Sequence, residues 1–246
     1  MSKILILTEG KDPDKKLIEH IVKEFQIKGE VIWAKIGTIY AFYKDIKEKY
    51  DENMDVIRYI KYKYSDKISK EFKASEISYV YLFFDYDLHS KLNEEYENFE
   101  KIYDRINEIS EINSFFENET ENGKLYLSFP MIEAYHKPIG CNYIYEKNNF
   151  EEKLEDFKVF KKKIKNETGN MGMTALKSQY KEIIKFYINN SENILEMKFK
   201  DVEKNKILKF QNELLKSKNK VKIYPSIPIF LNEYYKIEKL QEKLEI

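Results

Sequence analysis

Residues 80–87 read VYLFFDYD, an apolar run that ends abruptly in two aspartates one residue apart. A short run of aromatic and branched apolar residues is typical of a buried β-strand. Side chains two apart on a strand point the same way, so Asp85 and Asp87 are expected to project together from its carboxyl end. Two such carboxylates repel each other unless a cation or a proton lies between them. The pattern favours Mg²⁺, which takes oxygen ligands, although acids also end strands as helix caps or solvated loop residues.

Strand-like and helix-like segments alternate over the first part of the chain. The expected strands are Lys3–Thr8, Val31–Ile36, Ser78–Phe84 and Leu125–Phe129. The expected helices are one opened by Asp12-Pro13-Asp14 and ended by Gly29, residues 39–73 with a break near 51–53, Leu92–Phe116, and a short helix from Pro130 that stops before Pro138. A turn is expected at Asn118–Gly123. This alternation predicts an α/β fold with a mostly parallel sheet flanked by helices.

The pattern changes near residue 150. The expected elements there are helices at Phe150–Lys165, Thr174–Asn189, Asp201–Lys216 and Ile227–Leu244, with a short strand at Val221–Tyr224. We therefore predict an α/β region at 1–148 and a mainly helical region at 149–246, without a linker that would make the second a separate domain.

Composition narrows the class of protein. The single cysteine, Cys141, excludes an intramolecular disulfide and a zinc site built on several cysteines. The first apolar run is too short for a signal peptide, and no run is long enough to span a bilayer, so a cytoplasmic protein without a membrane partner is expected. Acids are in excess before residue 150 and bases after it. A metal-dependent enzyme acting on phosphodiesters could use that asymmetry, although an ordinary fluctuation also explains it.

Glu9 ends the first expected strand as Asp85 ends the third, so three carboxylates meet at one sheet edge if these strands are parallel neighbours. A strand, Glu-Gly, a helix and a later strand ending in Asp-x-Asp together resemble the TOPRIM domain of topoisomerases, bacterial primases and OLD nucleases. The matching segments are residues 5–10 (LILTEG) and 82–87 (LFFDYD), with Gly37 after the second strand, and the resemblance covers roughly 1–136. It implies a Rossmann-like sheet, Mg²⁺ or Mn²⁺ held by Asp85 and Asp87, and Glu9 as a general acid/base or metal ligand.

Within this family the chain resembles most the stand-alone RloB-like and OLD-like nucleases of bacterial phage defence. Those proteins carry a further acid after the next strand, and residues 128–135 (SFPMIEAY) supply Glu133 here. The resemblance implies that Glu133 joins the same metal cluster; the alternative is an acid favoured by the helix dipole. Leu88-His89-Ser90 follows Asp87 without the glycine or third acid of topoisomerases and primases, which disfavours a role in DNA topology.

The resulting expectation is a metal-dependent endonuclease that hydrolyses DNA or RNA, a toxic effector in antiviral defence by abortive infection. Lys11 is a candidate for the cation that assists at the scissile phosphate, or else a solvated loop residue. The chain has no P-loop, so an ATPase partner would be a separate chain. Two alternatives stay open: a non-catalytic TOPRIM-like binding or sensor subunit, and another enzyme that uses Asp-x-Asp, such as a glycosyltransferase or a haloacid-dehalogenase-like phosphatase.

The histidines and a lysine run complete the candidates. His136 shares a helix face with Glu133, His89 follows the aspartate pair, and His20 fits a structural or exposed position. The lysines could form a phosphate-contacting face or a solvated one. They are Lys158, Lys161, Lys162, Lys163, Lys165, Lys177, Lys181 and Lys185.

Overall fold

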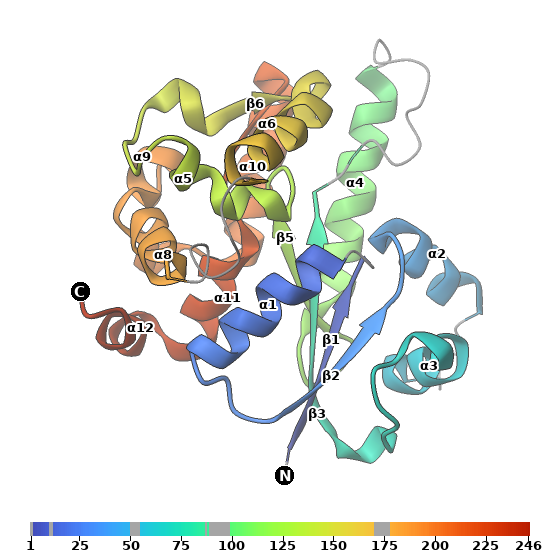
Figure 1. Cartoon of the computed structure of the whole chain (residues 1–246). Coiled ribbons are helices and arrows are strands. Elements are labelled where there is room, and N and C mark those ends of the chain that lie inside the picture. Colours follow the sequence, from blue (N-terminus) through green and yellow to red (C-terminus); the bar gives the residue numbers. More distant parts are fainter. Residues whose placement is uncertain (1, 10–11, 50–54, 87, 89–98, 170–177) are drawn as a thin grey trace. The chain divides into compact units, whose positions relative to one another are not determined.

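The computed structural model of the chain describes residues 2–9, 12–49, 55–86, 88, 99–169 and 178–246 (Figure 1). Packing divides the chain into two units, Met1–Phe84 with Asn98–Tyr126 and Asp85–Glu97 with Leu127–Ile246. The division at residue 148, which follows the sequence pattern, stays a prediction. Among the helices in the described residues, none combines the length and the apolar character needed to cross a bilayer.

A five-stranded sheet has the strand order β2-β1-β3-β5-β4. Its strands are β1 (Lys3–Thr8), β2 (Glu30–Lys35), β3 (Ile77–Asp85), β4 (Glu117–Asn118) and β5 (Gly123–Ser128). β1 pairs in parallel with both β2 and β3, whereas β4 pairs antiparallel with β5. Residues 4–7 of β1 are each at most 1% exposed, as expected for a strand with both faces covered. The predicted α/β class with a mostly parallel sheet is confirmed.

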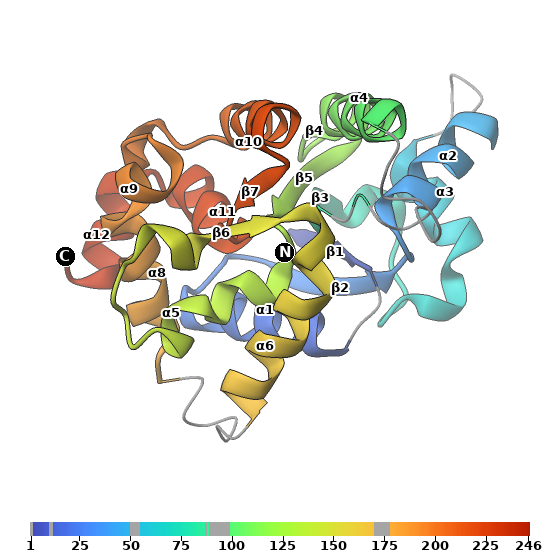
Figure 2. The same cartoon turned by 90° about the horizontal axis from the view of Figure 1, so that it is seen from above.

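Helices cover both faces of this sheet. They are α1 (Asp12–Glu24), α2 (Ile39–Lys49), α3 (Val56–Lys63) and α4 (Phe99–Phe115). Figures 1 and 2 show α1 on one face and α4 with α2 on the other. The α2–α4 contact is aromatic: the Tyr43 ring meets the edge of the Phe115 ring with 5.3 Å between ring centroids. The apolar residues of α1 face the core, with Leu17, Ile18 and Ile21 buried as their spacing predicts.

The predicted helix over residues 39–73 is wrong beyond Lys63. The chain turns there through η1 (Ser65–Lys67) and runs along β2, with an antiparallel bridge between Ile68 and Ala34, before η2 (Ala74–Glu76) leads into β3. The Ser69 amide donates to the Trp33 carbonyl at 2.8 Å, and the Trp33 amide donates to Ser69 Oγ at 2.9 Å. The unpaired backbone groups of an outer strand favour this pairing over a longer helix.

The second unit is mainly helical, as predicted for the C-terminal region. Its elements are η3 (Ile132–His136), α5 (Lys137–Gly140), η4 (Lys147–Phe150), β6 (Glu151–Lys153), η5 (Leu154–Asp156), α6 (Phe157–Gly169), α8 (Tyr180–Asn189), α9 (Ser191–Leu195), η6 (Phe199–Asp201), α10 (Lys204–Lys218), β7 (Lys220–Lys222), α11 (Ser226–Tyr235) and α12 (Ile237–Leu244). β6 and β7 form a separate antiparallel pair.

Tyrosines fill the core of this unit, and their hydroxyls are paired. The rings of Tyr187 and Tyr224 lie 5.1 Å apart, and the Tyr224 hydroxyl donates to the Tyr187 carbonyl at 3.3 Å. The Tyr135 hydroxyl donates to the Tyr180 carbonyl at 3.0 Å. All four residues are buried. Burying a phenol costs free energy unless its hydroxyl is bonded, so this network lets large side chains serve as core.

Several predicted boundaries in the second half are wrong. The helix expected from Phe150 begins at Phe157, because Glu151–Lys153 pairs with β7 instead. The helix from Pro130 was expected to stop before Pro138, but Pro138 lies in the first turn of α5, where no amide donor is needed. The closing helix breaks at Lys236, which has φ of +64°.

Smaller differences occur at other element ends. Asn118, expected in a turn, pairs with Gly123 in the β4–β5 ladder. Sequence patterns locate such short elements poorly, because two or three residues give no readable period. Parts of two predicted helices, residues 92–98 and 174–177, lie outside the described residues.

Candidate functional site

Two of the predicted acids continue from the ends of neighbouring strands. β1 and β3 pair in parallel with Thr8 opposite Phe83. Glu9 follows Thr8, and Asp85 is the last residue of β3. The condition on which the predicted site depends, that the first and third strands are parallel neighbours, is therefore met. Open α/β sheets bind ligands at the carboxyl ends of their strands, so both acids occupy chain positions suited to a site.

Asp85 is fixed by a backbone contact within the second unit. Its side chain is buried, at 8% exposure, and its Oδ1 accepts a hydrogen bond of 2.8 Å from the Ile132 amide. A bond from an amide to a carboxylate is charge-assisted and orients the acid. Ile132 directly precedes Glu133, so the structure brings these two predicted site acids to neighbouring positions. The fully buried Tyr86 anchors the chain after Asp85 by donating to Asn212 Oδ1 at 2.6 Å.

Glu133 lies in η3, and its two oxygens differ. Oε1 forms an ion pair of 2.9 Å with Lys161 of α6. Oε2 is buried and has no hydrogen-bond partner among the described residues. A buried acceptor without a partner costs about 1–3 kcal/mol. A hard cation or one of its waters would satisfy this oxygen, so the donor at Glu133 fits a Mg²⁺ ligand. Lys161, one of the lysines for which a phosphate-contacting or a solvated face was expected, forms an ion pair with this acid.

His136 ends η3, one turn after Glu133. Burial lowers the pKa of its imidazole from 6.5 to about 4, although the Glu133 carboxylate opposes the shift. Its Nδ1 is buried without a hydrogen-bond partner in the described part of the chain. The ring is therefore neutral at pH 7, with a free lone pair or an unpaired N–H at Nδ1.

We expect His136 to make the protein less stable in acid. The unfolded imidazole binds a proton below its ordinary pKa of 6.5, whereas the folded one does so only near pH 4. The unfolded state thus binds more protons between these values, and the free energy of unfolding falls as pH falls through this window, by about 3 kcal/mol in total. Urea unfolding of the wild type and of His136→Gln at about pH 7 and about pH 4.5 measures it. The variant should lose less stability on acidification, and equal losses would contradict the buried neutral ring.

The remaining candidates do not extend the site. Lys11, Asp87, His89 and Lys177 lie outside the described residues, as does the side chain of Lys165. His20 lies on α1, where its Nδ1 is 2.5 Å from the Lys16 carbonyl oxygen, which fits the structural role. Among the described residues, no three His, Cys, Asp or Glu side chains are grouped closely enough to hold a metal. The predicted set of Glu9, Asp85, Asp87 and Glu133 therefore stays a prediction.

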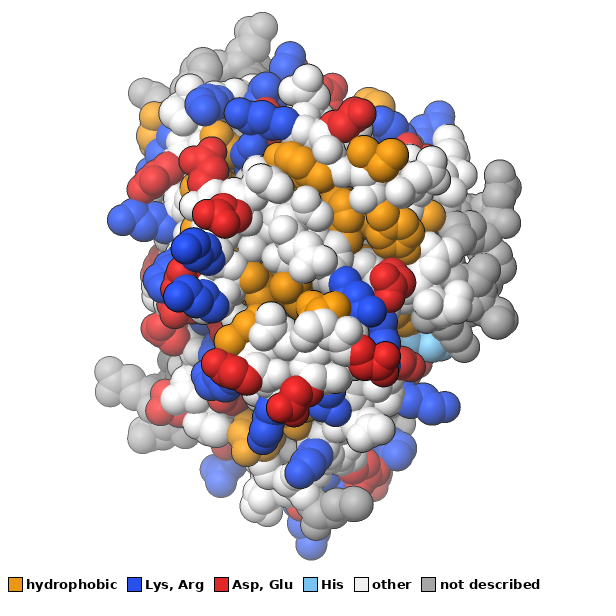
Figure 3. Space-filling model, turned by 90° about the vertical axis from the view of Figure 1, so that its left-hand side faces the viewer, with side chains coloured by type: hydrophobic (Ala, Val, Ile, Leu, Met, Phe, Trp, Pro, Cys, Tyr) orange, Lys and Arg blue, Asp and Glu red, His pale blue; other side chains and the backbone are white. Residues whose placement is uncertain are grey.

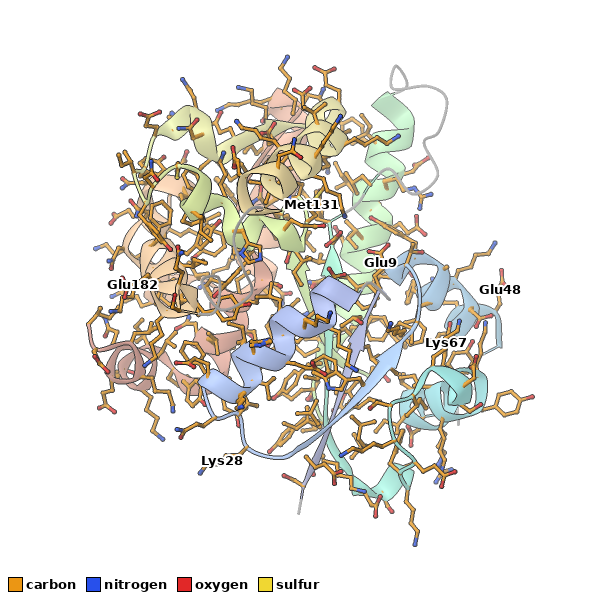
Figure 4. All side chains as sticks on the ribbon, in the orientation of Figure 1. Glu9, Lys28, Glu48, Lys67, Met131 and Glu182 are labelled. Atoms are coloured by element: carbon orange, nitrogen blue, oxygen red, sulfur yellow. The ribbon has the colours of Figure 1, made fainter. Side chains whose placement is uncertain are left out.

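A pocket of about 550 Å³ opens in the first unit at the carboxyl ends of β1 and β2. Glu9 lies on its wall together with three lysines, so we call it the lysine pocket. The lysines are Lys15 on α1, Lys35 at the end of β2 and Lys67 in η1. Figure 4 labels Glu9 and Lys67. Sequence reasoning did not select these lysines. Lys35 ends β2, so the reasoning that selected Glu9 at the end of β1 would also have selected Lys35. Lys67 was expected within the helix over residues 39–73, but that part of the chain forms η1 instead.

The surface outside the site is mixed in charge. On the face shown in Figure 3, Lys and Arg side chains alternate with Asp and Glu among hydrophobic patches. The formal net charge of the whole chain is zero at pH 7, with 43 Lys and Arg against 43 Asp and Glu. Local arrangements such as the lysine pocket, rather than net charge, must then provide any attraction for an anionic partner.

The family resemblance depends on residues 5–10 and 82–87, which end β1 and β3. No protein-family model, curated protein or solved structure matches the chain.

Proposed function

We propose that this protein is a metal-dependent TOPRIM-like nuclease that hydrolyses phosphodiester bonds in DNA or RNA. The observation that supports this most is the bond between the Ile132 amide and the Asp85 carboxylate, which joins Asp85 to the residue that precedes Glu133. The parallel pairing of β1 with β3 adds Glu9, whose strand ends next to the one that carries Asp85. Carboxylate oxygens are the protein ligands that a hard divalent cation prefers.

Each acid has a distinct role in this proposal. Asp85, Asp87 and Glu133 would hold Mg²⁺ or Mn²⁺, and the bond to Ile132 keeps one Asp85 oxygen oriented. Bound there, the cation would polarise the phosphate, lower the pKa of a water and stabilise the leaving oxygen. Glu9 would accept the proton of the attacking water or complete the ligand set. Lys11, close after Glu9 in sequence, would neutralise charge on the phosphate.

The biological setting is part of the same proposal. A nuclease of this kind would act as a toxic effector in antiviral defence, in the cytoplasm, with a separately encoded ATPase as a candidate trigger. The resemblance of residues 82–87 and 128–135 to the RloB-like and OLD-like proteins supports this setting.

The test is a cleavage assay on plasmid DNA and on total RNA with Mg²⁺ or Mn²⁺. We expect cleavage by the wild type, none after chelation, and a loss of at least about 100-fold in Asp85→Asn. The substituted amide keeps an oxygen that can accept the Ile132 bond, so it removes the charge with little effect on folding. Glu238→Gln, an exposed acid on α12, is the matched control and should cut normally.

Two results would count against the proposal. One is metal-independent cleavage that Asp85→Asn leaves unchanged. The other is a folded wild type that neither cuts nucleic acid nor takes up Mg²⁺ or Mn²⁺ in calorimetry, which would favour the non-catalytic alternative.

A further inference from the structure

We propose that the lysine pocket binds one phosphate-bearing nucleotide of the strand that is cut beside Glu9. This inference rests on the proposed function and specifies where the substrate lies. The pocket belongs entirely to the first unit and is formed by β1, α1, β2 and the segment 66–69. Glu9 is part of its wall, so a strand whose phosphate reaches Glu9 can continue into it.

The charge of the wall favours a phosphate. The lining carries three ammonium groups from separate elements, those of Lys15, Lys35 and Lys67. It also carries two carboxylates, those of Glu9 and Asp66. The lining thus has one positive charge in excess. A divalent cation held at Glu9 would raise this excess and attract a phosphodiester more strongly.

Two of these ammonium groups are held by aromatic rings. Lys15 Nζ lies 5.8 Å from the centroid of the Trp33 ring and 3.4 Å from Glu19 Oε1. Lys67 Nζ lies 5.5 Å from the centroid of the Tyr64 ring and, within the described part of the chain, forms no ion pair with a carboxylate. Lys67 keeps most of its charge for a ligand, because the ring that it contacts carries no net charge, whereas Glu19 offsets part of the charge of Lys15.

The far wall of the pocket is built on backbone bonds. Ile68 bridges to Ala34, and Ser69 exchanges two hydrogen bonds with the backbone of Trp33. The segment that carries Lys67 is therefore attached to the same strand that carries Lys35. Groups placed on such a scaffold are pre-organised, which lowers the entropy lost when a ligand binds.

The size and lining indicate how the nucleotide is recognised. A volume of about 550 Å³ lies in the range of small-ligand pockets and exceeds the need of a bare anion. Trp33 is only 8% exposed, and the Lys15 ammonium stands over its ring, so the ring is not a free stacking platform. Recognition through charge on the phosphate predicts binding with little base preference.

Trp33 is the only tryptophan of the chain and lies in this wall, so its fluorescence reports on the pocket. We would titrate the full chain in EDTA with a short oligothymidylate, with thymidine monophosphate and with inorganic phosphate. The oligonucleotide should give a saturable change, with weaker binding of the other two. Lys35→Gln and Lys67→Gln should each weaken oligonucleotide binding about tenfold and flatten its salt dependence.

The matched control is Lys23→Gln, an exposed lysine in the last turn of α1 away from the pocket lining. It removes the same charge from the same unit and should bind as the wild type does. Anisotropy of a labelled oligonucleotide gives a second measure that does not depend on Trp33. Equal affinity of the wild type, Lys35→Gln and Lys67→Gln would overturn the inference. Binding of inorganic phosphate or the monophosphate as tight as that of the oligonucleotide would also overturn it, in favour of a free small anion.

The two proposals fail separately. Binding in EDTA needs no metal and no cleavage, so lysine-dependent binding without nuclease activity would support the pocket and reject the proposed reaction. Cleavage that Asp85→Asn abolishes, together with normal binding and cleavage by both lysine variants, would keep the reaction and reject the pocket.

Discussion

Glu9→Gln is expected to reduce metal-dependent cleavage by about 10²- to 10⁴-fold, the contribution typical of a positioned general base. The substitution keeps the shape of the side chain and removes its charge and its ability to accept a proton. Glu9 is half-buried directly after β1, and the strand itself is held by apolar residues, so the free energy of unfolding should change little. The initial rate on nucleic acid with Mg²⁺ measures the first effect, and urea unfolding measures the second.

The same variant separates catalysis from binding. The negative charge of Glu9 offsets part of the positive charge of the three lysines in the lysine pocket. Removing it should therefore leave the affinity for the oligonucleotide in EDTA unchanged or raise it. Glu71→Gln, an exposed acid in the same unit, is the control and should retain full activity. A Glu9→Gln protein that binds and cuts at the wild-type rate would remove Glu9 from the mechanism.

Sequence reasoning predicted the parts of the fold that have long, regular patterns. The apolar runs of β1 and β3, and the Asp-Pro start of α1, gave their positions to within about two residues. The alternation of strands and helices predicted parallel strands, because crossover connections return the chain in the same direction, whereas the pairing of the first strand with the third was only a condition of the predicted site. The positions of Glu9 and Asp85 at strand ends could therefore be predicted from the sequence.

Elements whose conformation depends on distant partners were not predicted. The composition of residues 64–69 is compatible with a helix. Ile68 and Ser69 instead pair with the outer edge of β2. Glu151–Lys153 likewise pairs with a strand about 70 residues later in the chain. A three-residue strand of this kind has no hydrophobic period that would predict it from the local sequence. The lysine pocket was missed for the same reason, because its far wall exists only when segment 66–69 is docked on β2.

The bond from Ile132 to Asp85 could not be read from sequence either. It joins residues 47 positions apart and depends on how the chain leaves β5. The resemblance to OLD-like proteins named Glu133 for the cluster, as an acid at the start of a short helix beyond a strand end. The hydrogen bond joins Asp85 to the residue before Glu133, and the membership of all four acids in one cluster stays a prediction.

Gly123→Ala is expected to destabilise the protein by about 2–6 kcal/mol, although the substitution removes no interaction. Gly123 begins β5 with φ of +103°, a conformation that costs a residue with a Cβ about 1–3 kcal/mol. An added Cβ would also lie 2.6 Å from Leu82 Cδ1 and 3.0 Å from Val80 Cγ1. Both side chains are fully buried in β3, so relieving the overlap requires a shift of the core, which typically costs another 1–3 kcal/mol.

Gly37→Ala separates the two contributions and is the matched control. Gly37 also has a positive φ, of +79°, but an added Cβ there would meet no atom within 4 Å. Only the backbone strain remains, so a loss of about 1 kcal/mol is expected. Urea unfolding of the wild type and of both variants measures the difference. A larger loss in Gly37→Ala than in Gly123→Ala would contradict the packing of β5 against β3, because crowding by Leu82 and Val80 is the one contribution that the two glycines do not share.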